Sequence, residues 1–238
     1  MKIAKSVVVL SVRHISRNLA RKRAEVFTVE GLAPKDFTKL HSFMLEHFVA
    51  DEPLCRVLKM SPKEADVVVG DVVNACLQKP ISYAIKNEED RIVAARLCHF
   101  LDRPKKNEVS EGPNYESWKA NKIFNFLRAM EEKIWDLIPP EVNTVMNISM
   151  LAVDQNYTRR GFGLQLLEHN LKDLKNYGCK DVTAECTALY SQNLLINKFG
   201  CKPIYDIFHK EWLDEEGKMI FECDDGTNRG TLVYKHLD

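Results

Sequence analysis

The segment from Thr144 to Val153 limits the possible folds of this chain more than any other. Its residues are nearly all apolar or small, and many favour strands, which is typical of a buried central strand. A glycine pair follows, and the leucines beyond it recur at the spacing of one helical face: Leu164, Leu167, Leu171 and Leu174. Gly178 is expected to end that helix in the left-handed conformation. A buried strand, a glycine turn and a helix in this order indicate an α/β protein.

The other hydrophobic patterns supply the rest of a mixed sheet. Strands are expected at 25–29, 81–85, 91–100, 181–186, 202–212 and 230–236. Helices are expected at 34–48, 62–78, 123–137 and 191–199. Ser61 and Glu64 form a capping box before the second of these helices, and Pro139 and Pro140 end the third. Because no repeat or long linker divides the chain, we expect a single α/β domain over residues 25–238.

The composition excludes several classes of protein. The chain has 238 residues, 45% hydrophobic and 29% charged, with 34 Lys plus Arg against 34 Asp plus Glu, which is typical of an ordinary globular protein. The zero net charge argues against a strongly nucleic-acid-binding protein, and no apolar stretch approaches the ~20 residues that span a membrane. The seven cysteines and seven histidines show no metal-binding spacing. We therefore expect reduced thiols, no metal, and no nucleic-acid or membrane partner.

The zero net charge hides a basic leader. Residues 1–24 hold seven of the 34 bases and no acid, so residues 25–238 carry a net charge of −7. As a helix, the leader would place four apolar side chains on one face: Val8, Val12, Ile15 and Leu19. This pattern is typical of a mitochondrial transit peptide, and a weakly docked basic extension is an equal alternative. We expect a cytoplasmic protein, or a mitochondrial matrix protein if the leader is a transit peptide.

The glycine turn from Arg159 to Leu164 is the most informative motif. Glycines let the backbone approach a ligand, and the free N–H groups at the start of a helix attract phosphate oxygens. The motif is not a Walker loop, because no Gly-Lys-Ser/Thr follows, and Leu166 stands at the third glycine of a dinucleotide fingerprint. Tight packing of the strand against the helix is the structural alternative.

Here the chain resembles the GNAT superfamily of acetyl-CoA-dependent N-acetyltransferases. Residues 158–163 match the family's pyrophosphate motif, [Q/R]-x-x-G-x-[G/A], except that Thr158 takes the first position. Residues 150–154 resemble the family's splayed strand, and 193–200 resemble its last helix, where Ile196 replaces a frequent catalytic tyrosine. The resemblance implies acetyl-CoA as cosubstrate, bound by Leu151, Ala152, Val153, Arg159, Arg160, Gly161, Phe162, Gly163, Leu164 and Asn193.

Two further segments resemble invertebrate arylalkylamine N-acetyltransferases of the dopamine type. Residues 48–54 are similar to that group's F-x-x-D-E-P-L, and residues 186–191 to its C-S-S-x-Y-S. The resemblance extends over roughly residues 25–237, and it implies acetyl transfer to a small-molecule primary amine, of the arylalkylamine type. A polyamine or protein N-acetyltransferase, and a CoA-binding protein without amine transfer, are the alternatives.

The same resemblance assigns the catalytic roles to Glu52, Thr187 and Ser191. An amine with a pKa near ~10.4 is protonated at neutral pH and must lose a proton before it attacks a thioester, so Glu52 is expected to be the base. Thr187 and Ser191 match the group's two serines, which relay protons, and Tyr190 is a second candidate acid. Capping of helix ends is the alternative explanation for Glu52 and for Ser191, as an N-cap.

We expect direct attack in a ternary complex. Cys186 is the candidate nucleophile for a covalent route, but no histidine neighbours it in sequence, and a buried strand cysteine is the more common case. A wide acidic channel would favour polyamines, whereas an apolar, aromatic-lined pocket would favour arylalkylamines. Since no apolar segment is left over once the domain is assigned, we expect a monomer.

Overall fold

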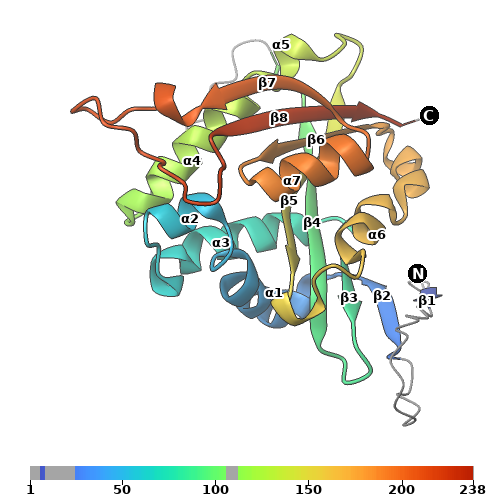
Figure 1. Ribbon diagram of the computed structural model, residues 1–238. Helices are drawn as coiled ribbons and strands as arrows, with labels where there is room; N and C mark the ends of the chain where they lie inside the picture. The colour runs from blue at the N-terminus through green and yellow to red at the C-terminus, as the bar shows by residue number, and fades with distance from the viewer. Residues whose placement is uncertain (1–5, 9–24, 106–111, 238) are drawn as a thin grey trace.

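One mixed sheet organises the part of the chain that the computed structural model describes, residues 6–8, 25–105 and 112–237. In these residues eight strands follow the order β1-β2-β3-β4-β5-β6-β8-β7 (Figure 1). Their bounds are Ser6–Val8, Phe27–Gly31, Tyr83–Lys86, Ile92–Asp102, Thr144–Val153, Asp181–Cys186, Lys202–Phe208 and Arg229–His236, for β1 to β8 in chain order. The pair β5–β6 is parallel and the other described pairs are antiparallel, so the expected mixed α/β fold is confirmed.

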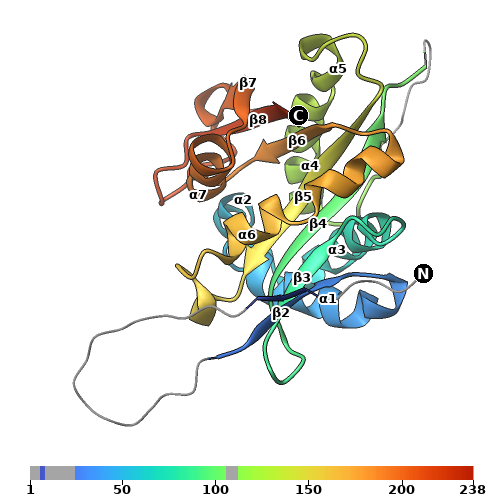
Figure 2. The same ribbon diagram turned by 90° about the vertical axis from the view of Figure 1, so that its right-hand side faces the viewer.

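Helices cover both faces of this sheet. The α-helices are α1 (Phe37–Phe43), α2 (Pro53–Val57), α3 (Pro62–Cys76), α4 (Trp118–Glu131), α5 (Ile134–Leu137), α6 (Phe162–Glu168) and α7 (Leu189–Asn193). Short 3₁₀ and π segments join them: η1 (Pro34–Asp36), η2 (Met44–Phe48), η3 (Gln155–Tyr157), η4 (Leu171–Tyr177), η5 (Leu194–Lys198) and η6 (His209–Glu211). Figure 2 shows α6 and α7 on one face, with α1 and α3 on the other.

The core side chains of β5 change faces at a bulge, because the extra residue Ser149 reverses the alternation of the side chains. Met150 and Ala152 pack with α1 and α3, whereas Met146 and Ile148 pack with the residues of α6, η4 and η5 on the opposite face. A strand that contributes to the core on both of its faces must be nearly all apolar. This is why Thr144–Val153 was recognisable in the sequence, and the strand has these bounds.

Two local predictions are confirmed by the backbone. Ser61 accepts a hydrogen bond from the backbone N–H of Glu64, and the Glu64 carboxylate accepts one from the backbone N–H of Ser61. Gly178 closes η4 in the left-handed conformation, with φ of 68°. Both features depend on neighbouring residues alone, so a sequence reveals them readily.

The single helix expected after the glycine pair is interrupted. α6 ends at Glu168, and Asn170 adopts a φ of 58° before η4 begins. The buried guanidinium of Arg96, from β4, donates hydrogen bonds to the carbonyl oxygens of Leu166 and Leu167 at 2.5 and 3.1 Å. Because Arg96 satisfies the last carbonyls of α6, the helix can end there without unpaired polar groups.

The leader differs from the expected helix where it is described. Ser6–Val8 is a strand that pairs antiparallel with Phe27–Val29. Val7 and Val8 are β-branched, which favours a strand over a helix. The remaining leader residues, 1–5 and 9–24, lie outside the described residues, so the interpretation of 1–24 as a transit peptide or a basic extension stays a prediction.

Candidate active site

Strands β5 and β6 separate soon after they meet. Their parallel pairing is limited to Met146–Val182 and Asn147–Thr183, and Figure 1 shows β6 turning away from β5. The register of β5 against β4 shifts so that Ser149 is left as an extra residue, and such a bulge bends a strand. Residues of both strands beyond the last pair line a cavity of about 1320 Å³. The separation of β5 and β6 therefore creates an open seam in the sheet, and this seam opens into the cavity.

The glycine turn closes one end of this cavity. Arg159 and Gly161 have φ of 61° and 81°, and left-handed residues in a turn direct successive N–H groups toward a shared anion site. A Cβ at Gly161 would meet nothing within 4 Å, whereas one at Gly163 would lie 3.1 Å from the Leu194 side chain. Gly161 is therefore required by the backbone conformation, and Gly163 by close packing of α6 against η5.

The cofactor-binding residues expected from the resemblance divide into two groups. Seven of them line the cavity: Leu151, Ala152, Val153, Arg159, Gly161, Phe162 and Gly163. The other three lie outside its lining. Arg160 pairs with Glu25, Leu164 packs against the core under α6, and the Asn193 amide donates to the carbonyl oxygen of Leu189.

Glu52 lies at the start of α2, a helix that the sequence analysis missed. It is the N-cap residue, and its side chain is only 7% exposed. One carboxylate oxygen, Oε2, accepts a hydrogen bond from the backbone N–H of Cys55 at 2.7 Å, and Oε1 accepts one from Thr187 Oγ1 at 2.8 Å. Burial raises the pKa of Glu52, and the hydrogen bonds from Cys55 and Thr187 lower it less. Glu52 caps a helix with one oxygen and lines the cavity in contact with Thr187.

Thr187 and Ser191 both line the cavity. Thr187 follows β6 directly, and its hydroxyl joins two segments 135 residues apart. Ser191 donates to the carbonyl oxygen of Ala188 at 2.8 Å. The N-cap residue of α7 is Ala188 and not Ser191, because the helix begins two residues earlier than expected, at Leu189. Ser191 still caps the start of this helix, since its hydroxyl accepts a hydrogen bond from the Ala188 N–H at 3.4 Å.

Two other side chains were candidates for chemical roles, Tyr190 as an acid and Cys186 as a nucleophile. Tyr190 also lines the cavity, and it is 72% exposed. Cys186 is buried, and burial raises the pKa of its thiol far above the usual range. The thiolate is the nucleophilic form of cysteine, so the surroundings of Cys186 disfavour a covalent route through its sulfur.

The part of the cavity away from the glycine turn contains polar residues that the sequence did not reveal. Asn147 Nδ2, on β5, donates to both carboxylate oxygens of Glu185, on β6, at 3.2 and 3.0 Å. Burial and the nearby Glu131 carboxylate raise the pKa of Glu185 to about 7, against the opposing effect of Asn147. Burial also raises the pKa of Glu131, at the end of α4. The signal in the sequence was slight: a single Glu between apolar neighbours in 181–186.

Aromatic side chains also line the cavity: Tyr115, Phe124 and Trp135. Tyr115 and Phe124 contact edge to face, with ring centroids 6.1 Å apart. Aromatic pairs in this geometry favour each other beyond the area that they bury. The lining of the cavity therefore combines apolar ring surface with carboxylates.

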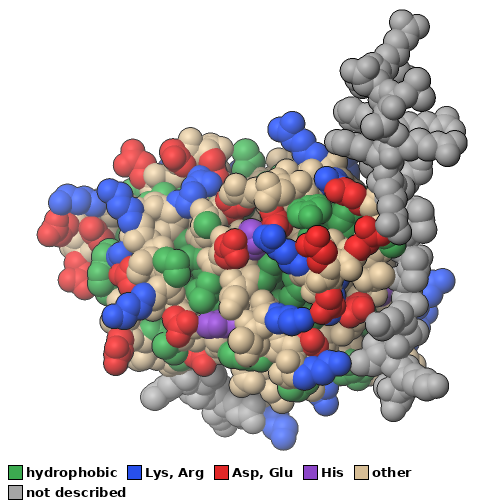
Figure 3. Space-filling view, turned by 90° about the horizontal axis from the view of Figure 1, so that it is seen from below, with side chains coloured by type: hydrophobic (Ala, Val, Ile, Leu, Met, Phe, Trp, Pro, Cys, Tyr) green, Lys and Arg blue, Asp and Glu red, His purple; other side chains and the backbone are tan. Residues whose placement is uncertain are grey.

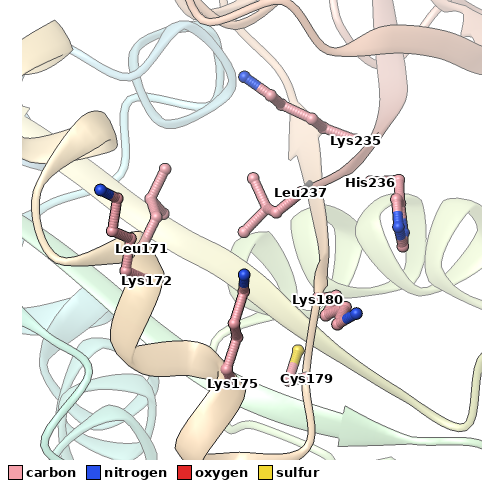
Figure 4. Close-up of a pocket in the computed structure, with 8 residues that line it drawn as sticks. All are labelled: Leu171, Lys172, Lys175, Cys179, Lys180, Lys235, His236 and Leu237. Carbon is pink, nitrogen blue, oxygen red and sulfur yellow. The ribbon is translucent and has the colours of Figure 1, made fainter.

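A smaller cavity of about 240 Å³ shares no lining residue with the large one. Figure 4 shows its lysines, which include Lys172, Lys175 and Lys235. Lys235 donates a hydrogen bond to the carbonyl oxygen of Phe199, and His236 pairs with Asp181. None of the candidate site residues lies there, and these contacts give two of its polar side chains structural partners.

Other surface features carry less information. On the face seen in Figure 3, Lys and Arg side chains alternate with Asp and Glu side chains over the described residues. No helix in the described ranges is long and apolar enough to cross a membrane. Within the same ranges no three His, Cys, Asp or Glu side chains are grouped as a metal site would need. The absence of a metal, the cellular compartment and the monomeric state stay predictions.

Comparisons with known proteins agree with this fold. Residues 129–201 match the model of the Acetyltransferase (GNAT) family. Arylalkylamine N-acetyltransferase 2 from Aedes aegypti has a TM-score of 0.77 at 20% identity, over 89% of this chain and 99% of that one. A putative arylalkylamine N-acetyltransferase 7 from the same mosquito has a TM-score of 0.76 at 19% identity, over 91% and 90%.

A third structure has a different substrate in its description. Drosophila melanogaster polyamine N-acetyltransferase, which catalyses the formation of N-acetylagmatine, has a TM-score of 0.72 at 20% identity, over 89% of this chain and 100% of that one. At these identities the likeness shows the fold. It does not separate an aromatic amine from a polyamine as the acceptor.

Proposed function

Because this chain contains a GNAT acetyltransferase domain, we propose that it transfers an acetyl group from acetyl-CoA directly to a primary amine, with Glu52 as the base. The observation that carries the proposal is the contact between Glu52 and Thr187. It brings a buried carboxylate and a hydroxyl together at 2.8 Å on the lining of the large cavity.

The residues around the seam fit acetyl-CoA. The left-handed Arg159 and Gly161 and the free N–H groups at the start of α6 suit a pyrophosphate, and the Arg159 side chain adds a positive charge. Residues 151–153 of β5 face the open seam, where an extended arm can lie beside a strand. When bound, acetyl-CoA supplies the acetyl group as a reactive thioester.

Glu52 is suited to take a proton from an amine. A carboxylate with an ordinary pKa near ~4.3 is a weak base at neutral pH, and general bases work best with a pKa close to the working pH. Burial moves the pKa of Glu52 in that direction. The N–H of Cys55 and the hydroxyl of Thr187 hold one oxygen each, so the carboxylate keeps a fixed orientation toward the cavity.

Thr187 and Ser191 provide the hydroxyls through which a proton can move away from Glu52. Thr187 is already bonded to the base, and Ser191 lies on the same cavity lining. This arrangement supports the proton relay that the resemblance implies, although Ile196 stands where many related enzymes have a tyrosine. The raised pKa of the Cys186 thiol supports direct attack by the amine.

Arylalkylamines are our first candidate acceptors, because Tyr115, Phe124 and Trp135 line the cavity. Diamines and polyamines are the second candidate, and a specific observation favours them. Glu185 and Glu131 lie in the same part of the cavity, close enough for their charges to interact. An ammonium group would compensate such a pair.

The decisive test is thiol release from acetyl-CoA with a panel of acceptors: tyramine, dopamine, serotonin, tryptamine, spermidine and a short peptide. Release that depends on a small amine, and that Glu52→Gln lowers at least 100-fold, would support the proposal. Tight binding of acetyl-CoA with no release by any of these acceptors would overturn it in favour of a CoA-binding protein.

A further inference from the structure

We propose that Glu185, together with Glu131, binds a second cationic group of the acceptor, so that the enzyme prefers a diamine to a monoamine of the same length. This inference rests on the proposed amine acetylation, and it favours the second class of candidate acceptor, the diamines, over a monoamine such as an arylalkylamine. Glu185 is then a specificity-determining residue, whereas Glu52 acts on the amine that is acetylated.

The position of Glu185 relative to the base suits a short diamine. Glu185 and Thr187 are two residues apart on β6 and its extension, and both line the cavity. Residues i and i+2 of a strand share a face and lie about 7 Å apart. Thr187 touches Glu52. The two carboxylates are therefore separated by a distance that the two nitrogens of a short extended diamine can span.

The Glu185 carboxylate is held in place, and part of its bonding capacity is left over. Asn147 is 1% exposed and donates to both oxygens of Glu185. Asn147 is in turn bonded to Ser149, and Ser149 to His99 Nδ1 at 2.8 Å. A carboxylate offers about four acceptor positions, so a further donor can bind on the cavity side of Glu185.

An unpartnered hydroxyl lies next to this carboxylate. Thr183 is two residues before Glu185 on the same face of β6 and is completely buried. Its Oγ1 has no hydrogen-bond partner among the described residues. Thr183 does not line the cavity, so this hydroxyl lies behind the carboxylate and is not counted as part of the proposed subsite.

The charges around the cavity also favour a cation. Its lining contains eight carboxylates and three arginines. Arg56 pairs with Asp224 and Asp225, and Arg159 belongs to the glycine turn. Arg128 pairs with Glu132 and also lowers the pKa of Glu131, by less than burial and the Glu132 charge raise it. Bringing Glu185 and Glu131 together without a cation costs free energy. A bound ammonium group would offset that cost, whereas a monoamine at Glu52 would not.

The test compares matched acceptors in wild type and variants. We expect kcat/KM for putrescine to exceed that for n-butylamine at least tenfold in the wild type. Glu185→Gln should lower this ratio at least tenfold, because the amide removes the charge at nearly constant shape. Asp102→Asn is the matched control, since Asp102 lines the same cavity but accepts a hydrogen bond from Thr144 Oγ1, and it should preserve the ratio.

Two outcomes would overturn the inference: a wild type that prefers n-butylamine, or a ratio that Glu185→Gln leaves within twofold. Turnover of n-butylamine in either case would leave the proposed function standing. If Glu185→Gln does not fold, Glu131→Gln gives the same comparison from the opposite wall. Calorimetric binding of putrescine and n-butylamine in the presence of CoA tests the preference without turnover. A protein that binds putrescine more tightly but releases no thiol would contradict the proposed function and leave this inference standing.

Discussion

The two ends of the large cavity are built in different ways. The end proposed for the cofactor is made of backbone, with left-handed turns at Arg159 and Gly161 and the open edge of β5. The end proposed for the acceptor is made of side chains from separate elements, Glu52, Asn147 and Glu185. A backbone site needs a short local motif, whereas a side-chain site needs the whole fold. The first is therefore visible in a sequence. Of the second, Glu52 was visible because it lies in a short motif, whereas Asn147 and Glu185 became visible only in the structure.

The largest expected effect is a loss of amine turnover at the acceptor end without a change in cofactor binding at the other end. Glu52→Gln removes the base but keeps an oxygen that can accept from the Cys55 N–H. We expect kcat/KM for the amine to fall by about 10² to 10⁴, with the affinity for acetyl-CoA unchanged by calorimetry. Glu64→Gln is the matched control, because Glu64 also bonds a backbone N–H at a helix start, that of Ser61, but lies outside the cavity lining. Amine turnover within threefold of wild type would reduce Glu52 to a capping residue.

The second effect concerns stability at the acceptor end. The pKa of Glu185 is raised to about 7 in the fold, from 4.5, so the unfolded chain ionises first as the pH rises. The stability that protonated Glu185 contributes is fully present below about pH 4.5 and is lost as the pH rises to about 7. Glu185→Gln lacks this loss, so we expect it to be more stable than wild type by the order of 2 kcal/mol at pH 8, and by much less at pH 4.5.

Urea unfolding at the two pH values measures this difference. Glu52 also has a raised pKa, but it is present in both proteins and cancels in the comparison. Glu131 interacts with Glu185, so loss of the Glu185 charge also favours the ionised form of Glu131 and acts in the same direction. An equal stability difference at pH 4.5 and pH 8 would show that Glu185 has no raised pKa. A carboxylate that lowers the stability of the protein at pH 8 and lines a cavity is expected in a binding site rather than in the core.

The third effect tests the cofactor end. Gly161→Ala forces an alanine into a φ of 81°, which costs roughly 1–2 kcal/mol. If the turn relaxes, its N–H groups move, and KM for acetyl-CoA should rise about tenfold with little change in KM for the amine. Gly178→Ala is the matched control, since it has a similar φ of 68° and equally open surroundings but lies outside the cavity lining. Equal KM values for acetyl-CoA in the two variants would contradict an anion site at the turn.

The smallest effect lies in the contact between Thr187 and the base. Thr187→Val keeps the shape and removes the hydroxyl, at a cost of about 1 kcal/mol or a factor of about five in kcat. The Thr187 hydrogen bond lowers the pKa of Glu52, so its loss should move the acidic limb of the pH–rate profile to higher pH. Thr187→Ser retains the hydroxyl, so its kcat and the acidic limb of its pH–rate profile should stay close to those of the wild type. A shift to lower pH would contradict the assigned contact.

The contrast between the two ends also explains how far the sequence could be interpreted. Strands Thr144–Val153 and Asp181–Cys186 and the cap at Ser61 depend on local patterns, and they were predicted with correct bounds or partners. The break after Glu168 was not predicted, because it depends on Arg96, about 70 residues away in the chain. Tertiary contacts of this kind override the helical pattern of the leucines.

The candidate site shows the same division. The resemblance pointed to Glu52 and Thr187, and the structure brings them into contact across 135 residues of sequence. It could not point to Glu185, Asn147 or Glu131, since their meeting depends on the register of β5 and β6 and on the docking of α4. Their significance follows from shared burial and charge, which no short motif encodes.

The seam between β5 and β6 has a consequence for the lifetime of the protein. The half of the sheet that contains β6, β7 and β8 is joined to the other half by only two parallel residue pairs. Any ligand that fills the seam binds the folded chain and not the unfolded one, and at 100 times its Kd it adds about 2.7 kcal/mol of stability. Proteases act on opened chains. Degradation should therefore slow when the seam is filled, and the abundance of the protein would then follow the supply of its ligand.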